Sequence, residues 1–189
     1  MLALAANGYT FDRRATAVAH LGSHRYSVVP ATPEHVYDLA ANLRPADEAE
    51  ILGSGHGVKR SLWRGYRNSV LCETAIVDAK VAAMWGLTVG FVPGLSLLGN
   101  TGRPWLLTSP LVEQVPFAVV REAKRAVMRM LAVKPLLENY VLASYEKAVR
   151  LVRLVGFTVD DPIVNQQGIA YHRFHMSRQI AIRRTAING

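Results

Sequence analysis

The stretch from Trp105 to Phe157 constrains the fold of this chain more than any other. Its hydrophobic pattern predicts two strands that alternate with two amphipathic helices, over residues 105–109, 116–131, 139–142 and 145–155. Pro116 is a residue that favours the first turn of a helix, and Gly156 is one that favours the end of a helix. Strands that alternate with helices in this way are typical of an α/β sheet protein.

The residues before this stretch predict strands and a helical insertion. Strands are expected over residues 26–29, 70–77 and 81–87, and helices over 33–43 and 58–66, with another turn near 47–50. Thr32 is the expected N-cap of the first helix, with Pro33 at its first position and His35 where a capping-box glutamate would stand. Asp78-Ala79-Lys80 predicts a hairpin turn, so the strands up to Trp105 are expected to form an antiparallel meander.

Length and composition predict one folded domain with extensions. The chain has 189 residues, of which 50% are hydrophobic, enough to build a core. We expect an N-terminal arm over residues 1–24, a domain over 25–176 and a basic C-terminal tail over 177–189. The arm is either a flexible tail or a segment that reaches a neighbouring subunit. No apolar run has the roughly 20 residues that span a bilayer, so no membrane association is expected.

Positive charge is concentrated in the second half of the chain. The net charge is +8, and residues 116–189 contain twelve Lys and Arg against five Asp and Glu. Acids are scarce on the two helices of this half, so we expect few ion pairs there and a basic surface that faces phosphate, with DNA as a candidate partner. A solvated helix face is the alternative. The predicted basic surface consists of Arg121, Lys124, Arg125, Arg129, Lys147, Arg150, Arg153, Arg178, Arg183 and Arg184.

Few residues indicate a specific chemistry. The single cysteine, Cys72, excludes an internal disulfide and a cysteine-based zinc site, and its place within a strand predicts a buried, unreactive thiol. The six histidines lack metal-ligand spacing, so no metal is expected. Glu73 is a lone strand carboxylate that nothing singles out as a base. Residues 53–57 are glycine-rich, but Lys59-Arg60-Ser61 follows at the wrong spacing for a phosphate-binding loop, so we expect a plain inter-helix loop.

The order of elements over residues 25–176 resembles the GNAT N-acetyltransferase fold. The most specific part is the last helix, with Ala148 in its middle and Gly156-Phe157 at its end. This resemblance implies an α/β (α+β) fold with a mixed, mostly antiparallel sheet flanked by about four helices. Within that fold, residues 105–157 look similar to the internal virion protein A family of T7-like podophages. That similarity implies location in a virion or the host cytoplasm, phage structural proteins as partners, and a homo-oligomer within an assembly.

The chain departs from the GNAT pattern at two places. GNAT enzymes hold the pyrophosphate of acetyl-CoA in a glycine-containing turn, whereas the corresponding residues here are Val115, Pro116, Phe117 and Ala118. They include no glycine, and proline lacks the backbone N–H that could bind phosphate. GNAT enzymes often place a catalytic tyrosine four residues before the closing glycine, where this chain has Val152.

Two hypotheses follow from the resemblance and these departures. The first is a non-catalytic GNAT-fold virion or virion-assembly protein, an internal or head-tail component without cofactor or catalytic residues, which binds proteins and also DNA. The alternative is an active acetyl-CoA-dependent N-acetyltransferase with a divergent cofactor-binding turn. In that case Arg121, Lys124 and Arg125 replace the glycine turn with side-chain contacts to phosphate.

Overall fold

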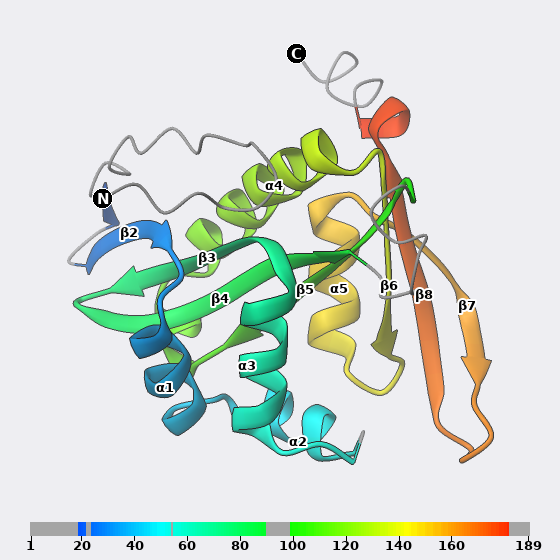
Figure 1. Ribbon diagram of the computed structural model, residues 1–189, viewed down its shortest axis with the longest axis horizontal. Coiled ribbons are helices and arrows are strands. Elements are labelled where there is room, and N and C mark those ends of the chain that lie inside the picture. Colours follow the sequence, from blue (N-terminus) through cyan, green and yellow to red (C-terminus); the bar gives the residue numbers. More distant parts are fainter. Residues whose placement is uncertain (1–18, 22–23, 54, 90–98, 182–189) are drawn as a thin grey trace.

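A computed structural model describes residues 19–21, 24–53, 55–89 and 99–181, and these residues form one eight-stranded sheet (Figure 1). The strands lie in the order β1-β2-β3-β4-β5-β6-β8-β7. All neighbours are antiparallel except β5 and β6, which are parallel. The strands are β1 (Ala19–Leu21), β2 (His24–Pro30), β3 (Ser69–Val77), β4 (Lys80–Val89), β5 (Thr101–Thr108), β6 (Leu136–Leu142), β7 (Thr158–Val164) and β8 (Ala170–Ser177).

Helices cover both faces of the sheet (Figure 1). They are α1 (Pro33–Ala41), α2 (Pro45–Gly53), α3 (Val58–Asn68), the 3-10 helix η1 (Pro110–Gln114), α4 (Pro116–Val133) and α5 (Glu146–Val155). One apolar cluster joins α1 and α3 to β4 through Leu39, Leu62 and Met84. The larger cluster lies on the opposite face, where α4 and α5 pack. Among the described residues, no helix has the length and apolar character that crossing a bilayer requires.

The predicted antiparallel meander is confirmed, and its first hairpin has a clear local cause. Asp78 and Ala79 both have positive φ angles, 48° and 64°, as the two central residues of a tight hairpin turn require. The Asp78 carboxylate accepts a hydrogen bond of 2.9 Å from the backbone N–H of Arg25 on β2. The turn therefore fixes the register of β3 and β4 and also ties both to the neighbouring strand.

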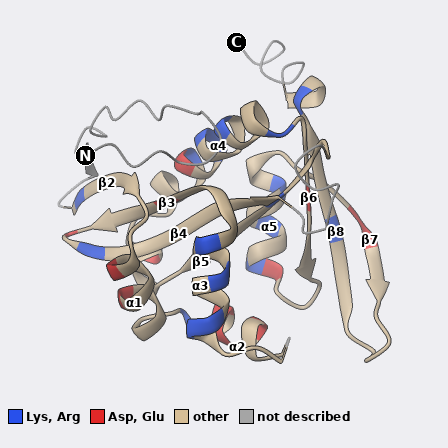
Figure 2. Ribbon diagram, in the orientation of Figure 1, with Lys and Arg blue, Asp and Glu red and all other residues tan. Residues whose placement is uncertain are grey.

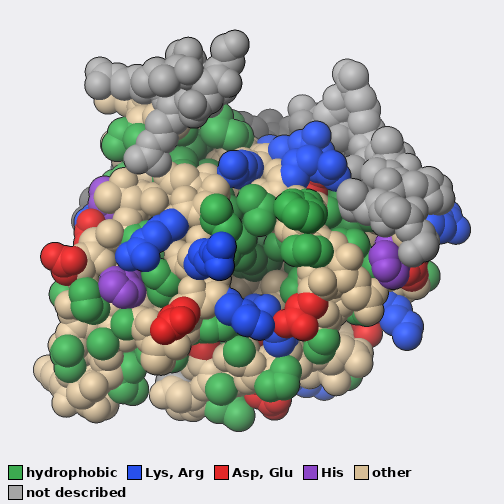
Figure 3. Space-filling model, turned by 180° about the vertical axis from the view of Figure 1, so that it is seen from behind, with side chains coloured by type: hydrophobic (Ala, Val, Ile, Leu, Met, Phe, Trp, Pro, Cys, Tyr) green, Lys and Arg blue, Asp and Glu red, His purple; other side chains and the backbone are tan. Residues whose placement is uncertain are grey.

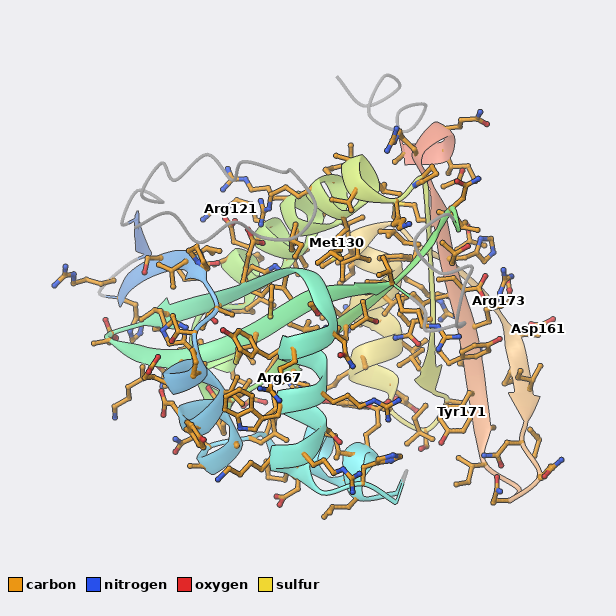
Figure 4. The ribbon with its side chains drawn as sticks, viewed as in Figure 1. Arg67, Arg121, Met130, Asp161, Tyr171 and Arg173 are labelled. Carbon is orange, nitrogen blue, oxygen red and sulfur yellow. The ribbon has the colours of Figure 1, made fainter. Side chains whose placement is uncertain are left out.

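The predictions for the second half of the chain are confirmed with one omission. The expected helices correspond to α4 and α5, and Gly156 ends α5 with a φ of 109°. No strand was predicted over residues 158–164, where the structure has β7 ahead of β8. Pro162 and the two aspartates before it are typical of a loop, so they did not indicate a strand. β7 tolerates proline because it lies at the sheet edge and pairs only with β8. Arg173 of β8 contacts Asp160 of β7 at 3.0 Å and Glu138 of β6 at 2.6 Å (Figure 4).

The predicted arm and tail are each partly placed in the folded domain. Residues 19–21 of the expected arm form β1, which pairs with β2 at the edge of the sheet. At the other end, Ser177 belongs to β8, and Ala181 is buried in the larger core cluster. His24 begins β2, whereas residues 1–18, 22 and 23 of the arm and residues 182–189 of the tail lie outside the described residues.

Candidate functional site

The candidate site begins where the two parallel strands separate. β5 and β6 pair at only two positions, Thr101 with Leu136 and Gly102 with Leu137. A side chain at Gly102 would meet Leu87 at 2.6 Å, so glycine permits the close approach at this point. Pro104 follows and has no backbone N–H to donate. Its carbonyl instead accepts a hydrogen bond of 2.9 Å from the side chain of Asn139, and beyond this link the strands diverge.

A large cavity of about 1060 Å³ lies at this divergence. Its lining includes residues of both strands, of α4 and α5 on one face, and of α2 and α3 on the other. On the α4 and α5 face the walls are mainly apolar, as at Leu106, Val119 and Val152. Figure 3 shows this face with a hollow lined by hydrophobic side chains and with Lys and Arg side chains around it. The cavity therefore offers an apolar channel that passes between two strands of the sheet.

A buried carboxylate on α2 connects the two sides of the divergence. Asp47 is only 4% exposed. It accepts hydrogen bonds from the Thr108 backbone N–H at 2.9 Å and the Thr108 hydroxyl at 2.5 Å, at the end of β5. It also accepts one of 3.0 Å from the hydroxyl of Tyr145, the residue before α5. Arg44 lies 3.4 Å from the Asp47 carboxylate and donates to the Tyr145 hydroxyl. These contacts hold α2, β5 and the start of α5 together at the cavity wall.

Burial raises the pKa values of two residues at this part of the cavity wall, Tyr145 and Glu50. Burial, with the nearby Asp47 charge as a second cause, raises the pKa of Tyr145, so this phenol stays protonated and serves as a donor. Glu50, one turn further along α2, also lines the cavity. Burial raises the pKa of Glu50 above its usual range, and the Asp47 charge adds to the increase. A carboxylate with a raised pKa is better suited to accept a proton near neutral pH than an ordinary surface glutamate.

The residues predicted at the cofactor turn lie at the start of α4. Val115 is buried and lines the cavity, Pro116 is the first helical residue, and Ala118 is buried beneath the helix. Phe117, by contrast, is 88% exposed. The first turn of α4 has neither an acidic residue nor a side-chain N-cap. This helix end therefore keeps the partial positive charge that favours an anion, although the glycine turn is absent.

The three arginines of α4 are paired, which corrects the expectation of few ion pairs on this helix. Arg125 and Arg121 contact the buried Glu122 at 2.6 and 3.3 Å. Arg129 contacts the buried Glu73 at 2.6 Å. The prediction failed because Glu73 comes from β3, 56 residues from Arg129 in sequence, and because one buried carboxylate, that of Glu122, contacts both Arg121 and Arg125. Figure 4 labels Arg121 on α4.

The other predicted basic residues differ in whether they contact an acidic group or a backbone carbonyl (Figure 2). Lys147 lines the cavity and lies 3.6 Å from Glu113. Within the described part of the chain, Lys124, Arg150 and Arg153 have no carboxylate at ion-pair distance. Arg178 binds the C-terminal end of α4, where its Nε donates to the Leu131 carbonyl at 2.7 Å. Arg183 and Arg184 lie outside the described residues. Whether this surface contacts phosphate stays a prediction.

Glu73 and Cys72, the other two residues considered for a chemical role, are both held within the sheet. Glu73 accepts a hydrogen bond of 2.8 Å from the Trp85 indole N–H in addition to its contact with Arg129. Its charge is thus satisfied within the core. Cys72 is half-buried, and burial raises the pKa of its thiol to about 12. A thiol with such a pKa is almost entirely protonated at neutral pH, which agrees with the predicted low reactivity.

Sequence reasoning missed the cluster of Arg44, Asp47, Glu50 and Tyr145. Asp47 and Tyr145 are 98 residues apart and meet only because α2 packs across the end of β5. Residues 47–50 read as a short acidic turn, and Tyr145 as the start of a helix. A buried aspartate in the first turn of a helix, here at position N3 of α2, is unusual, but burial becomes visible only in the folded chain.

Comparisons with known proteins identify the fold. No family model matches the sequence, and no curated protein matches it. Among solved structures, the chain is similar to aminoglycoside acetyltransferase AAC(6')-Ib in complex with ribostamycin and coenzyme A, with a TM-score of 0.62, 15% identity and coverage of 85% of this chain and 97% of that one. An acetyltransferase of the GNAT family from Streptococcus pneumoniae gives a TM-score of 0.55, 14% identity and coverage of 80% and 98%.

A third match leads to the same fold. The GNAT domain of S. lividans PAT superposes with a TM-score of 0.58 at 11% identity, over 80% of this chain and 91% of that domain. At such low identities the similarity concerns the fold and not the activity. The expected GNAT fold is therefore confirmed, and the part of the resemblance that concerns phage virion proteins has no support among these matches: the chain has the mixed α/β fold of GNAT acetyltransferases.

Proposed function

We propose that this protein is an acyl-CoA-dependent N-acyltransferase, which transfers an acyl group from a coenzyme A thioester to an amine. The observation that carries the proposal is the divergence of β5 and β6 after two residue pairs, with a cavity of about 1060 Å³ at that point. A domain core is normally packed without large voids. An open channel through the middle of a sheet is therefore better explained by a ligand than by packing.

The end of β5 can hold the thioester arm of the donor. Residues 105–108 pair with β4 on one side but have no strand partner on the side of β6. An unpaired strand edge offers backbone N–H and C=O groups to an extended ligand that carries amides, as the pantetheine arm does. The apolar walls at Leu106 and Val152 would contact the rest of the arm.

Side chains, rather than a glycine turn, are proposed to hold the diphosphate. The start of α4 favours an anion by its dipole, but Pro116 removes one N–H and no glycine permits close approach. Lys147 lies at the cavity, and Lys124 has no carboxylate at ion-pair distance among the described residues. Arg121 and Arg125 already contact Glu122, so their contribution to phosphate binding is reduced.

The chemistry requires one proton acceptor. The amine nitrogen attacks the thioester carbonyl, a C–N bond forms, the C–S bond breaks, and the sulfur leaves as a thiolate that takes up a proton. Glu50 is proposed to accept the proton that the amine loses, because it lines the cavity and burial raises its pKa. Asp47 and Tyr145 are proposed as positioning residues, since their hydrogen bonds join α2 to both sides of the cleft.

Binding and turnover test this proposal separately. Calorimetric titration with acetyl-CoA should show saturable binding in the micromolar range. Release of free thiol in the presence of a panel of amines then measures transfer. Glu50→Gln should remove transfer and leave donor binding intact, whereas Glu48→Gln on the exposed side of α2 should change neither. Unimpaired transfer by Glu50→Gln would show that another group takes the proton.

A second candidate function is a non-catalytic binding protein, as in a virion or its assembly. Two observations favour it: residues 115–118 include no glycine, and Val152 stands where GNAT enzymes often have a tyrosine. The partners proposed are phage structural proteins and DNA. This candidate predicts no heat with millimolar acetyl-CoA, DNA affinity that falls steeply with salt, and loss of that affinity on reversing the charges of Arg150 and Arg153. Detection of this chain by mass spectrometry in purified particles would support the virion setting.

A further inference from the structure

We propose that the donor carries an acyl chain longer than acetyl, and that this chain lies in a passage between α4 and strands β2 to β4. The inference rests on the proposed function, because the passage opens from the cleft where the thioester would lie. It specifies a substrate class: thioesters of unbranched, medium-length fatty acids.

The passage extends far beyond the divergence of β5 and β6. The same cavity is lined by Leu106 on β5, Ala83 on β4, Ala75 on β3 and Tyr26 on β2. Neighbouring strands are about 4.8 Å apart, so three spacings give a span of roughly 14 Å from β5 to β2. An acetyl group occupies only the first part of such a span. The remainder has the length and shape for a hydrocarbon chain.

Small side chains create this space on both walls. Ala75, Ala82 and Ala83 form the sheet side, and Ala123 and Ala126 form the α4 side. Each of the three sheet alanines is buried, with at most 4% of its surface exposed. Alanines that face one another leave a gap where leucine or valine would interdigitate. The gap belongs to the same cavity as the cleft, so it is open to a chain attached to the thioester carbonyl.

The passage has a polar end at β2. The Tyr26 side chain is buried, and its hydroxyl has no hydrogen-bond partner within the described part of the chain. Glu122 also lines the cavity, and its carboxylate is bound by Arg121 and Arg125. An unsatisfied buried hydroxyl is unfavourable next to a methyl group. We therefore expect the benefit of each added methylene to stop once the chain reaches Tyr26.

The first experiment is a chain-length series. Full-length protein is titrated by calorimetry with acetyl-, butanoyl-, hexanoyl-, octanoyl- and decanoyl-CoA. Each buried methylene should improve affinity by about fourfold until the passage is full, with an increasingly negative heat-capacity change of binding. We expect at least a hundredfold gain, roughly, between acetyl and octanoyl. Equal affinity across the series, with acetyl-CoA bound, would overturn the inference and leave the proposed function standing.

A matched pair of variants locates the chain. Ala126→Val narrows the passage, whereas Ala40→Val adds the same group at a partly buried helix position, on α1, that does not line the cavity. Ala126→Val should remove most of the chain-length gain and keep the affinity for acetyl-CoA, and Ala40→Val should keep both. Circular dichroism verifies folding, and Ala83→Val serves as the narrowing variant if Ala126→Val does not fold. A full chain-length gain in the narrowed variant would contradict the placement.

Failure of the proposed function would be recognised separately. If neither coenzyme A nor acetyl-CoA binds, the acyltransferase proposal fails. The passage is then tested with S-acyl N-acetylcysteamine thioesters of the same chain lengths, which lack the nucleotide. Affinity that rises with chain length and is lost in Ala126→Val would support an acyl-binding passage without coenzyme A recognition. No dependence on length would overturn the inference as well.

Discussion

Removal of the Asp47 carboxylate should destabilise the protein strongly. Asp47 is 4% exposed and accepts three hydrogen bonds, two from Thr108 and one from Tyr145, and it also contacts Arg44. A hydrogen bond to a charged group contributes about 1.5–3 kcal/mol, and leaving a buried charge unpaired costs about 3–5 kcal/mol. Because the cavity admits water to part of the cluster, we expect Asp47→Ala to cost about 3–5 kcal/mol in total. The melting temperature should fall by about 10 °C.

The assay is urea-induced unfolding followed by tryptophan fluorescence, with Glu48→Ala as the control. Glu48 is exposed on the same helix, so its removal should change stability by less than about 0.5 kcal/mol. A double-mutant cycle with Tyr145→Phe isolates one contact, and a coupling energy of about 1 kcal/mol is expected. If Asp47→Ala costs no more than Glu48→Ala, the claim that this carboxylate joins α2 to β5 and α5 is refuted.

Three further predictions concern ionisation and packing. Acyl transfer should be lost on acidification as Glu50 becomes protonated. Because burial raises the pKa of Glu50, the loss should occur above the ordinary glutamate pKa of 4.5. A dependence of the transfer rate on pH that is unchanged in Glu50→Gln would contradict this. The same burial favours the protonated form, so this group contributes stability at low pH that is lost as pH rises through its raised pKa. Cys72 should react slowly with iodoacetamide at pH 8, because burial raises the pKa of its thiol to about 12. It should react quickly once urea unfolds the chain. Rapid labelling of the native protein would disprove the burial of this thiol. Gly86→Ala should destabilise by about 1–3 kcal/mol in urea unfolding, because its Cβ would lie 2.9 Å from the Leu71 carbonyl; an unchanged midpoint would show that the sheet can yield there.

The sequence predicted the elements whose signals are local. Hydrophobic periodicity and the residues Pro116 and Gly156 identified α4 and α5 because these signals act within a few residues. β7 was missed because Asp160, Asp161 and Pro162 are typical of loops, and only its place at the sheet edge makes them compatible with a strand.

The site was much less accessible to prediction. Its polar cluster joins α2 to β5 and α5 over separations of 61 and 98 residues, so no window of sequence contains it. The ion pair between Arg129 and Glu73 was hidden in the same way, and the apparently unpaired basic helix face proved to be largely paired. The absent glycine turn was visible in the sequence, but the cleft beside it depends on the divergence of two strands.

Titration of the full chain with acetyl-CoA would decide whether the cleft between β5 and β6 binds an acyl-CoA thioester. We expect saturable heat with one site per chain and a dissociation constant in the micromolar range. The affinity should be weaker in a charge-reversal variant of Lys147. No heat at millimolar acetyl-CoA and none with longer acyl-CoA thioesters would contradict it.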